Sequence, residues 1–174
     1  VVAPGFRLSM IDRFGETGWR VINSVMSLVS LVVLIWGYAT APVINLWFPP
    51  MGMNHLTTTL MLFAMICLVA GFLPAGHIAT KTKHPIVLSI KIWAAAHLLA
   101  NGDLASVLLF VALLAWGVVL RISYKRRVRA GELVLKPFVS ARWDAIAVIG
   151  GIVVWAVITM WLHKLLIGVA PLAM

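Results

Sequence analysis

The sequence predicts an all-α protein, a polytopic bundle of five transmembrane helices that forms one domain over residues 1–174. Hydrophobic residues make up 63% of the chain and charged residues 11%, and the mean hydropathy is +1.05. So few polar side chains cannot cover a water-soluble globule, whereas lipid requires no such cover. The eight tryptophans suit interfacial anchoring, because an indole joins a large apolar body to one N–H donor.

The first two spans are apolar runs that end at proline. Residues 21–41 provide roughly the 20 residues that a helix needs to cross hydrocarbon, and Pro42 follows them. Residues 55–73 form the second span, which Pro74 ends. The preceding segment, residues 2–20, has a weak helical pattern, and we interpret it as interfacial.

The third and fourth spans form a helical hairpin with a polar turn. The third, residues 85–100, is short and begins with a proline in its first turn. Asn101 and Gly102 make a suitable helix C-terminus, and Asp103 can cap the fourth span, residues 104–120. Polar and ionisable groups at membrane depth indicate a functional site, so we expect this turn to carry chemistry.

Two runs of small residues favour close helix contacts. The fifth span, residues 143–166, contains Gly150 and Gly151, and the third contains alanine at 94–96. Such faces pack against helices of the same chain or against other subunits. A non-enzymatic accessory or structural subunit of a larger membrane complex is therefore one reading of the function.

The basic residues predict the orientation of the bundle. If five spans alternate, twelve of the fourteen basic residues fall on one side, which the positive-inside rule makes cytoplasmic. The loop 121–142 also suits attraction to anionic lipid, although a solvated topology determinant is the simpler interpretation. Nucleic-acid binding is not supported, because no aromatic residues are interleaved with the charges. The twelve are Arg7, Arg13, Arg20, Lys81, Lys83, Arg121, Lys125, Arg126, Arg127, Arg129, Lys136 and Arg142.

Three histidines from three spans fall in the opposite leaflet. They are His55, His97 and His163, and two imidazoles on facing helices suit the axial positions of haem iron. Asn101 or Asp103 would orient the His97 ring from its second nitrogen. A structural zinc site is less favoured, since no cysteine partner or short ligand spacing accompanies the histidines. The alternative is that each histidine is an interfacial hydrogen-bonding residue.

Lys91 lies midway along the third span, and its position has two interpretations. Its aliphatic stem can snorkel to the cytoplasmic side. Alternatively, its ammonium is a buried cation that balances a carboxylate, a haem propionate or a lipid phosphate.

Several motifs together resemble the NnrU family over essentially the whole chain. They are Trp36-Gly37-Tyr38, Lys83-His84-Pro85, the run from Trp93 through His97 and Asp103 to Ser106, and Trp161-Leu162-His163 with Ile167-Gly168-Val169. The resemblance implies a bacterial inner-membrane protein associated with denitrification. Members typically carry another hydrophobic segment upstream, so a sixth, N-terminal span is expected beyond this chain.

The family is also related to 15-cis-ζ-carotene isomerase, an integral membrane enzyme that uses haem b to isomerise a double bond. In that relative the axial ligation of the iron changes with redox state. The resemblance therefore implies haem b, held by His97 with His55 or His163 opposite. It also implies redox or isomerase-type chemistry on an apolar substrate, such as a polyene that enters from the lipid bilayer.

The Lys83-His84-Pro85 motif raises a further analogy. Membrane methyltransferases of the isoprenylcysteine type use an Arg-His-Pro-x-Tyr-x-Gly run to bind S-adenosylmethionine. Here Lys83, Val87 and Ser89 replace the Arg, Tyr and Gly of that run, so methyl transfer is the weaker alternative.

Overall fold

The computed structural model describes residues 4–172, and the chain divides into two compact units, Val1–Val43 and Ile44–Met174. The first unit contains α1 (Pro4–Thr40), in which Gly15 has non-helical angles (φ 70°, ψ 168°) and separates two helical parts. The part after Gly15 includes the predicted first span, and its apolar side chains are exposed as lipid contact requires. The segment before it is helical from residue 4, while its interfacial position stays a prediction.

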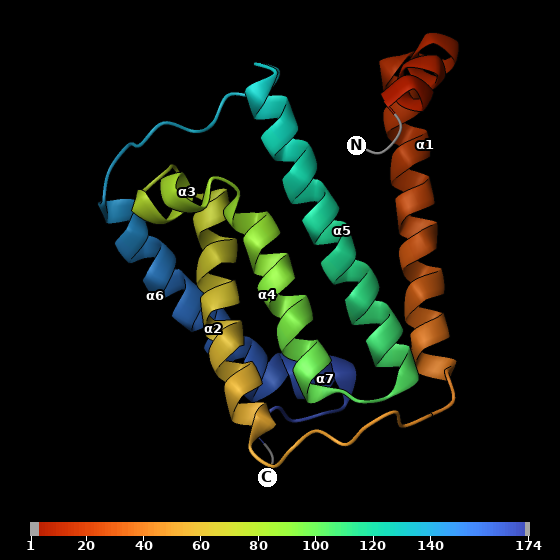
Figure 1. Cartoon of the computed structure of the whole chain (residues 1–174), viewed down its shortest axis with the longest axis vertical. Coiled ribbons are helices and arrows are strands. Elements are labelled where there is room, and N and C mark those ends of the chain that lie inside the picture. The colour runs from red at the N-terminus through yellow and green to blue at the C-terminus, as the bar shows by residue number, and fades with distance from the viewer. Residues whose placement is uncertain (1–3, 173–174) are drawn as a thin grey trace. The chain divides into compact units, whose positions relative to one another are not determined.

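The second unit is a layer of helices in the spatial order α6, α2, α4, α5 (Figure 1). Their bounds are α2 Met53–Phe72, α4 Pro85–Ala100, α5 Leu104–Arg129 and α6 Arg142–Val157. A π-helical turn, Ile158–Leu162, continues α6 into α7, His163–Ile167. α3 and α7 lie at opposite ends of this layer (Figure 1).

The predicted spans are confirmed with two corrections. The residues described include four helices long and apolar enough to cross a membrane, plus the shorter α4 of 16 residues. The helix that contains the fourth span continues past 120 to Arg129, because Arg and Lys are good helix formers and extend α5 beyond its apolar part. A short helix, α3 (His77–Thr82), lies between the second and third spans and was not predicted.

Small residues and polar threonines hold α2 between its neighbours. Gly151 of α6 is buried, and a Cβ there would stand 2.6 Å from the Cα of Ile66, which confirms the predicted close contact. The indole of Trp155 donates to the carbonyl of Thr58 at 2.9 Å. On the other side of α2, the Thr57 hydroxyl donates to the carbonyl of Ala96 at 3.1 Å. These contacts fix the helices that carry the histidines.

The turn between α4 and α5 is pinned by the extended segment before α2. The amide of Leu46 donates to the carbonyl of Gly102 at 2.8 Å, and that of Leu104 to the carbonyl of Ile44 at 2.9 Å. A Cβ on Gly102 would collide with the carbonyl of Trp47, so only glycine fits there. The polar turn is therefore held by the backbone on both of its sides.

At the opposite end, side chains from the loop after α5 and from α6 bind the region around α3. The Asp144 carboxylate accepts the amides of His77 and Ile78, each at 2.8 Å. The Lys136 ammonium donates to the carbonyls of Gly71 and Leu73, at 3.2 and 3.4 Å, where α2 ends. The loop is thereby folded back over the bundle.

Candidate functional site

The structure brings together two of the three predicted histidines. The rings of His97 on α4 and His163 on α7 have centroids 6.4 Å apart and planes inclined by 22°. Near-parallel rings at this separation lie toward the upper end of the range for offset aromatic pairs, so packing of the two rings is one description of the contact. A metal bound between two imidazole nitrogens stands about 2 Å from each, which requires ring centroids on the order of 6 Å apart. The pair therefore has the spacing of two imidazoles that share one metal ion.

Both rings are oriented by backbone carbonyls. Nδ1 of His97 lies 2.9 Å from the carbonyl oxygen of Trp93, and Nδ1 of His163 lies 2.7 Å from that of Val169. A carbonyl only accepts, so Nδ1 carries the proton in both rings. In a neutral imidazole Nε2 then keeps its lone pair, which is the form that binds a metal. Each ring thus offers one free donor nitrogen.

The helix that carries His163 changes its register immediately before that residue. The π-helical turn Ile158–Leu162 adds a residue to the turn, which rotates everything after it around the helix axis. Gly168 (φ 84°) then ends α7 in the left-handed conformation that glycine tolerates, and the chain returns the Val169 carbonyl to the ring of His163. Two local irregularities therefore set the direction of one side chain.

Aromatic rings cover His97. Phe110 of α5 lies 5.0 Å from the His97 ring between centroids, and Trp93 lies 5.2 Å from it. These two rings also contact each other, at 5.3 Å. His97 is half-buried in this cluster, whose apolar walls exclude water from one side of the pair.

Asn101 and Asp103 do not contact the His97 ring. The Asn101 amide donates to the backbone carbonyl of His97 at 2.7 Å and closes the end of α4. Asp103 caps α5 by accepting the Ser106 amide at 2.9 Å. Partial burial opposes ionisation, yet the hydrogen bonds from Ser106 hold the pKa of Asp103 below its ordinary value. The orienting role expected of these residues belongs instead to the Trp93 carbonyl.

His55 lies near the start of α2 and its side chain is exposed. Within residues 4–172 its ring has no hydrogen bond or ring contact, and its carbonyl accepts the Thr59 hydroxyl. The structure therefore does not add His55 to the pair, and its role as a ligand stays a prediction.

The donor set fits haem better than a fully protein-bound metal. No group of three or more His, Cys, Asp or Glu side chains able to hold a metal occurs among the described residues. A porphyrin supplies four nitrogens itself, so haem would ask for no more than two protein donors, and His97 and His163 are the residues that would hold it. The two imidazoles are consistent with that group.

The sequence matches the family model described as NnrU protein over residues 1–171. The chain belongs to the NnrU family. No curated protein and no solved structure gives a significant match.

Two of the four motifs that resemble the NnrU family meet in space. The Trp93-to-Ser106 motif contributes Trp93, its carbonyl and His97, and the C-terminal motif contributes His163 and the Gly168–Val169 turn. Segments more than sixty residues apart thus meet at one pair of imidazoles. The third motif, which contains His84, lies near α3 at the other end of the bundle.

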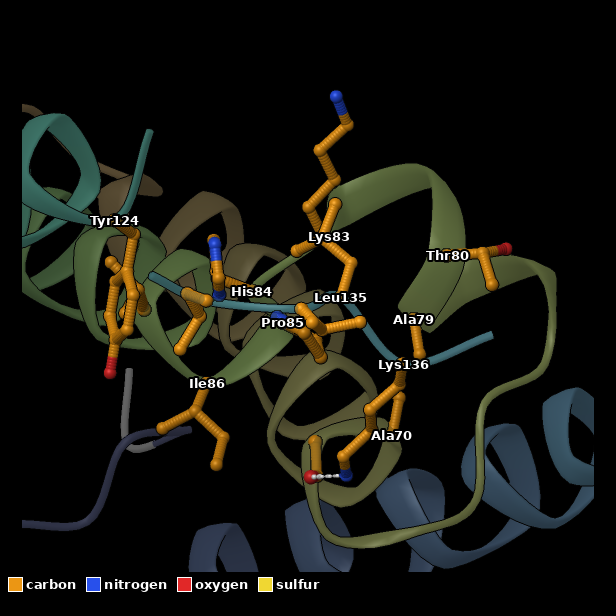
Figure 2. A pocket seen from close by; sticks show the side chains of 14 residues that line it. Ala70, Ala79, Thr80, Lys83, His84, Pro85, Ile86, Tyr124, Leu135 and Lys136 are labelled. Atoms are coloured by element: carbon orange, nitrogen blue, oxygen red, sulfur yellow. Dashed lines mark hydrogen bonds between the residues drawn. The ribbon is translucent and has the colours of Figure 1, made fainter. Parts of the chain in front are cut away.

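Around His84 lies a second feature, which the sequence analysis did not identify. A cavity of about 250 Å³ is lined by residues from the end of α2, from α3 and α4, by Tyr124 of α5, and by the folded-back loop 133–136 (Figure 2). The rings of His84 and Tyr124 stack with centroids 4.2 Å apart. The loop that closes this cavity is placed by tertiary contacts, which no local pattern indicates.

Lys91 lies between the two ends of α4. Its stem packs over Gly117 of α5, where a Cβ would stand 2.8 Å from the Lys91 Cγ. Across the described part of the chain its ammonium has no ion pair or hydrogen bond. No described carboxylate therefore balances this cation, and its other predicted counter-ions stay predictions.

Proposed function

We propose that this NnrU-family membrane protein binds haem b between His97 and His163. The observation that carries the proposal is the pair itself, with rings 6.4 Å apart and both Nδ1 atoms held by carbonyls. The carbonyls occupy Nδ1 and leave each Nε2 atom available, and polar atoms without a partner are costly in a lipid-facing bundle.

Haem, when bound, supplies a redox-active iron that acts as a Lewis acid or a one-electron centre. The residues of this chain then have distinct tasks. The Trp93 and Val169 carbonyls fix the tautomer and direction of the two ligands. Phe110 and the Trp93 ring keep water from the His97 side.

The two ligands differ in the rigidity of their supports. His97 lies within a regular helix between two other helices, whereas His163 follows a π-helical turn and begins a five-residue helix. Of the two residues that would hold haem, His163 therefore has the less rigid support. Haem held by these two residues would supply redox or cis–trans isomerase-type chemistry.

The surroundings of His163 suit an apolar substrate. Leu165 and Leu166 of α7 are 77% and 72% exposed, and although Lys164 beside them is exposed too, they offer an apolar surface to a lipid-soluble molecule such as a polyene. We place this end of the bundle on the non-cytoplasmic side of a bacterial inner membrane, since the basic loops lie at the other end. A role linked to denitrification is the cellular setting that the family suggests.

The accessory-subunit alternative receives less support from the fold. Ala94, Ala96 and Gly151, the small residues that a partner helix would use, are buried within the chain. The alternative predicts purification in a stoichiometric complex that shows no haem absorbance.

Visible spectra of the full-length protein in detergent, oxidised and dithionite-reduced, test the proposal together with a pyridine haemochrome assay. We expect b-type bands at near one haem per chain. A flat spectrum from folded protein reconstituted with haemin would contradict haem binding and favour the accessory role. Incubation of the reduced protein with a cis polyene, followed by chromatography of the isomers, then tests the chemistry.

A further inference from the structure

A basic cavity adjoins the apolar one at the end of the bundle opposite the histidine pair. Its volume is about 300 Å³, and it shares Lys83 and His84 with the 250 Å³ cavity of Figure 2. We call the two together the α3–α5 pocket. All of its residues belong to the second compact unit.

The basic half of the α3–α5 pocket gathers cations without counter-ions. Arg121, Lys125 and Arg129 recur at every fourth position of α5 and so share one face of the helix, and Lys83 approaches from the end of α3. Among the described residues none of these four has an ion pair. Glu132, the acidic residue that follows α5, pairs with Arg127 instead, at 3.5 Å. The result is a concave surface of one charge sign.

The same positive charges act on His84, which lies between the two halves of the pocket. Burial, followed by the charges of Arg121 and Lys83, lowers the pKa of His84. The lowered pKa favours the uncharged imidazole, whose ring stacks on Tyr124. An anion placed here would relieve the repulsion among the cations, whereas a cation would increase it.

The other half of the pocket is apolar. Ile86 and Val87 from α4 line it together with Leu133 and Leu135. The one loop cation that lines this half, Lys136, directs its ammonium to the backbone where α2 ends (Figure 2). An occupant of both halves must therefore be anionic at one end and apolar at the other.

We propose that the α3–α5 pocket binds a phosphate-bearing anion, with the phosphate among Lys83, Arg121, Lys125 and Arg129. A phospholipid is the source that the geometry favours, because the basic half lies where the apolar part of α5 ends, at the level of lipid headgroups. Its acyl or glycerol portion would occupy the half lined by Ile86 and Leu133. A sulfonium methyl donor fits poorly, since it would bring another positive charge to the cations.

The test compares two adjacent α5 residues of equal charge. Both side chains are exposed, but Lys125 lines the pocket and Arg126 does not. Native mass spectrometry of the full-length protein and its Lys125→Gln and Arg126→Gln variants would measure retention of phosphatidylglycerol and phosphatidylcholine. Titration calorimetry would measure inorganic phosphate. Loss of one charge-assisted hydrogen bond to phosphate weakens binding by about tenfold.

We expect phosphatidylglycerol to be retained over phosphatidylcholine, weakened by Lys125→Gln and unchanged in Arg126→Gln. Binding of inorganic phosphate that depends on Lys125, without a lipid preference, supports the site with a soluble source. Equal losses in the two variants, or binding of neither probe, would overturn the proposal and leave a diffuse basic surface. The result is independent of haem content, so the two proposals fail separately.

Discussion

Each end of the helical layer presents a pair of histidines with ordered partners, beside the exposed His55 at one end, and the two pairs are used differently. At one end, His97 and His163 have their Nδ1 atoms on carbonyls and their rings 6.4 Å apart. At the other end, His77 stacks on Phe138 at 4.5 Å and His84 on Tyr124 at 4.2 Å. The first arrangement leaves donor nitrogens free and the second buries ring faces.

The comparison shows that the group in contact with a histidine ring indicates what the ring can do, whereas the mere presence of a histidine does not. A carbonyl on Nδ1 fixes a tautomer and prepares Nε2 for a metal, while an aromatic partner uses the imidazole as a flat surface. Charge follows the same division, since the basic residues gather around His84 and not around His97. The two ends therefore suit different ligands, and substitutions can perturb both or one of them.

The largest effect is expected from Gly151→Ala, which disturbs both ends. The added Cβ meets the backbone of Ile66, and overpacking of this kind destabilises by about 1–3 kcal/mol. Because α6 leads into His163 at one end and carries Asp144 near the other, both ends should change. Unfolding in mixed detergent measures the loss.

Gly150→Ala is the matched control, since its Cβ would meet only the Val69 side chain, at 3.2 Å. Equal destabilisation by the two substitutions would show that the α2–α6 contact does not depend on Gly151.

Asp144→Ala should perturb the basic end alone. The carboxylate accepts two backbone amides, from His77 and Ile78, and leaving them without a partner costs about 1–3 kcal/mol. We expect a lower unfolding midpoint and faster proteolysis of the loop 130–141. The visible spectrum of haem bound at the histidine pair should not change. A spectral change as large as that of a His163 variant would show that the two ends are coupled.

Gly168→Ala should perturb the histidine end alone. Alanine in the left-handed region costs roughly 1–2 kcal/mol, and the strain falls on the turn that brings the Val169 carbonyl to His163. Gly131→Ala has the same kind of strain (φ 73°) in the loop after α5, and a Cβ meets nothing at either position. If only Gly168→Ala retains haem more weakly, the result supports the role of the Val169 carbonyl in orienting His163. Equal haem retention in the two variants argues against that role.

The smallest effect is expected from Asp103→Ala, which removes the cap of α5 and costs about 1 kcal/mol. Because folding lowers the pKa of Asp103, its contribution is complete above the ordinary carboxyl pKa and disappears as pH falls through the lowered one. The unfolding midpoint of the wild type should therefore fall more steeply with acid than that of Asp103→Asn. Parallel curves would exclude this carboxylate as a source of the pH dependence.

The sequence predicts the spans well because the length and apolarity of a transmembrane helix are local properties. The end of α5 differs from the prediction, since hydropathy falls after 120 while helix propensity does not. The spacing of Arg121, Lys125 and Arg129 is visible in the sequence, but as a topology signal it gives no reason to consider a pocket.

Half of the histidine site is also visible in the sequence. The leaflet shared by His97 and His163 follows from helix rise alone. The orienting groups do not follow, because backbone carbonyls leave no residue signature and the π-helical turn before His163 has no reliable sequence pattern. Tertiary packing therefore decides which polar groups reach the rings.

The most direct test of the account is the haem content of four histidine-to-alanine variants of the full-length protein, each purified after growth with a haem precursor. We predict that His97→Ala and His163→Ala lose the b-type spectrum or convert it to that of a singly ligated iron. His55→Ala and His77→Ala should retain it, as residues outside the pair. Loss in His55→Ala with retention in His163→Ala, or full haem content in His97→Ala, would contradict the central claim that these two imidazoles form the ligand pair.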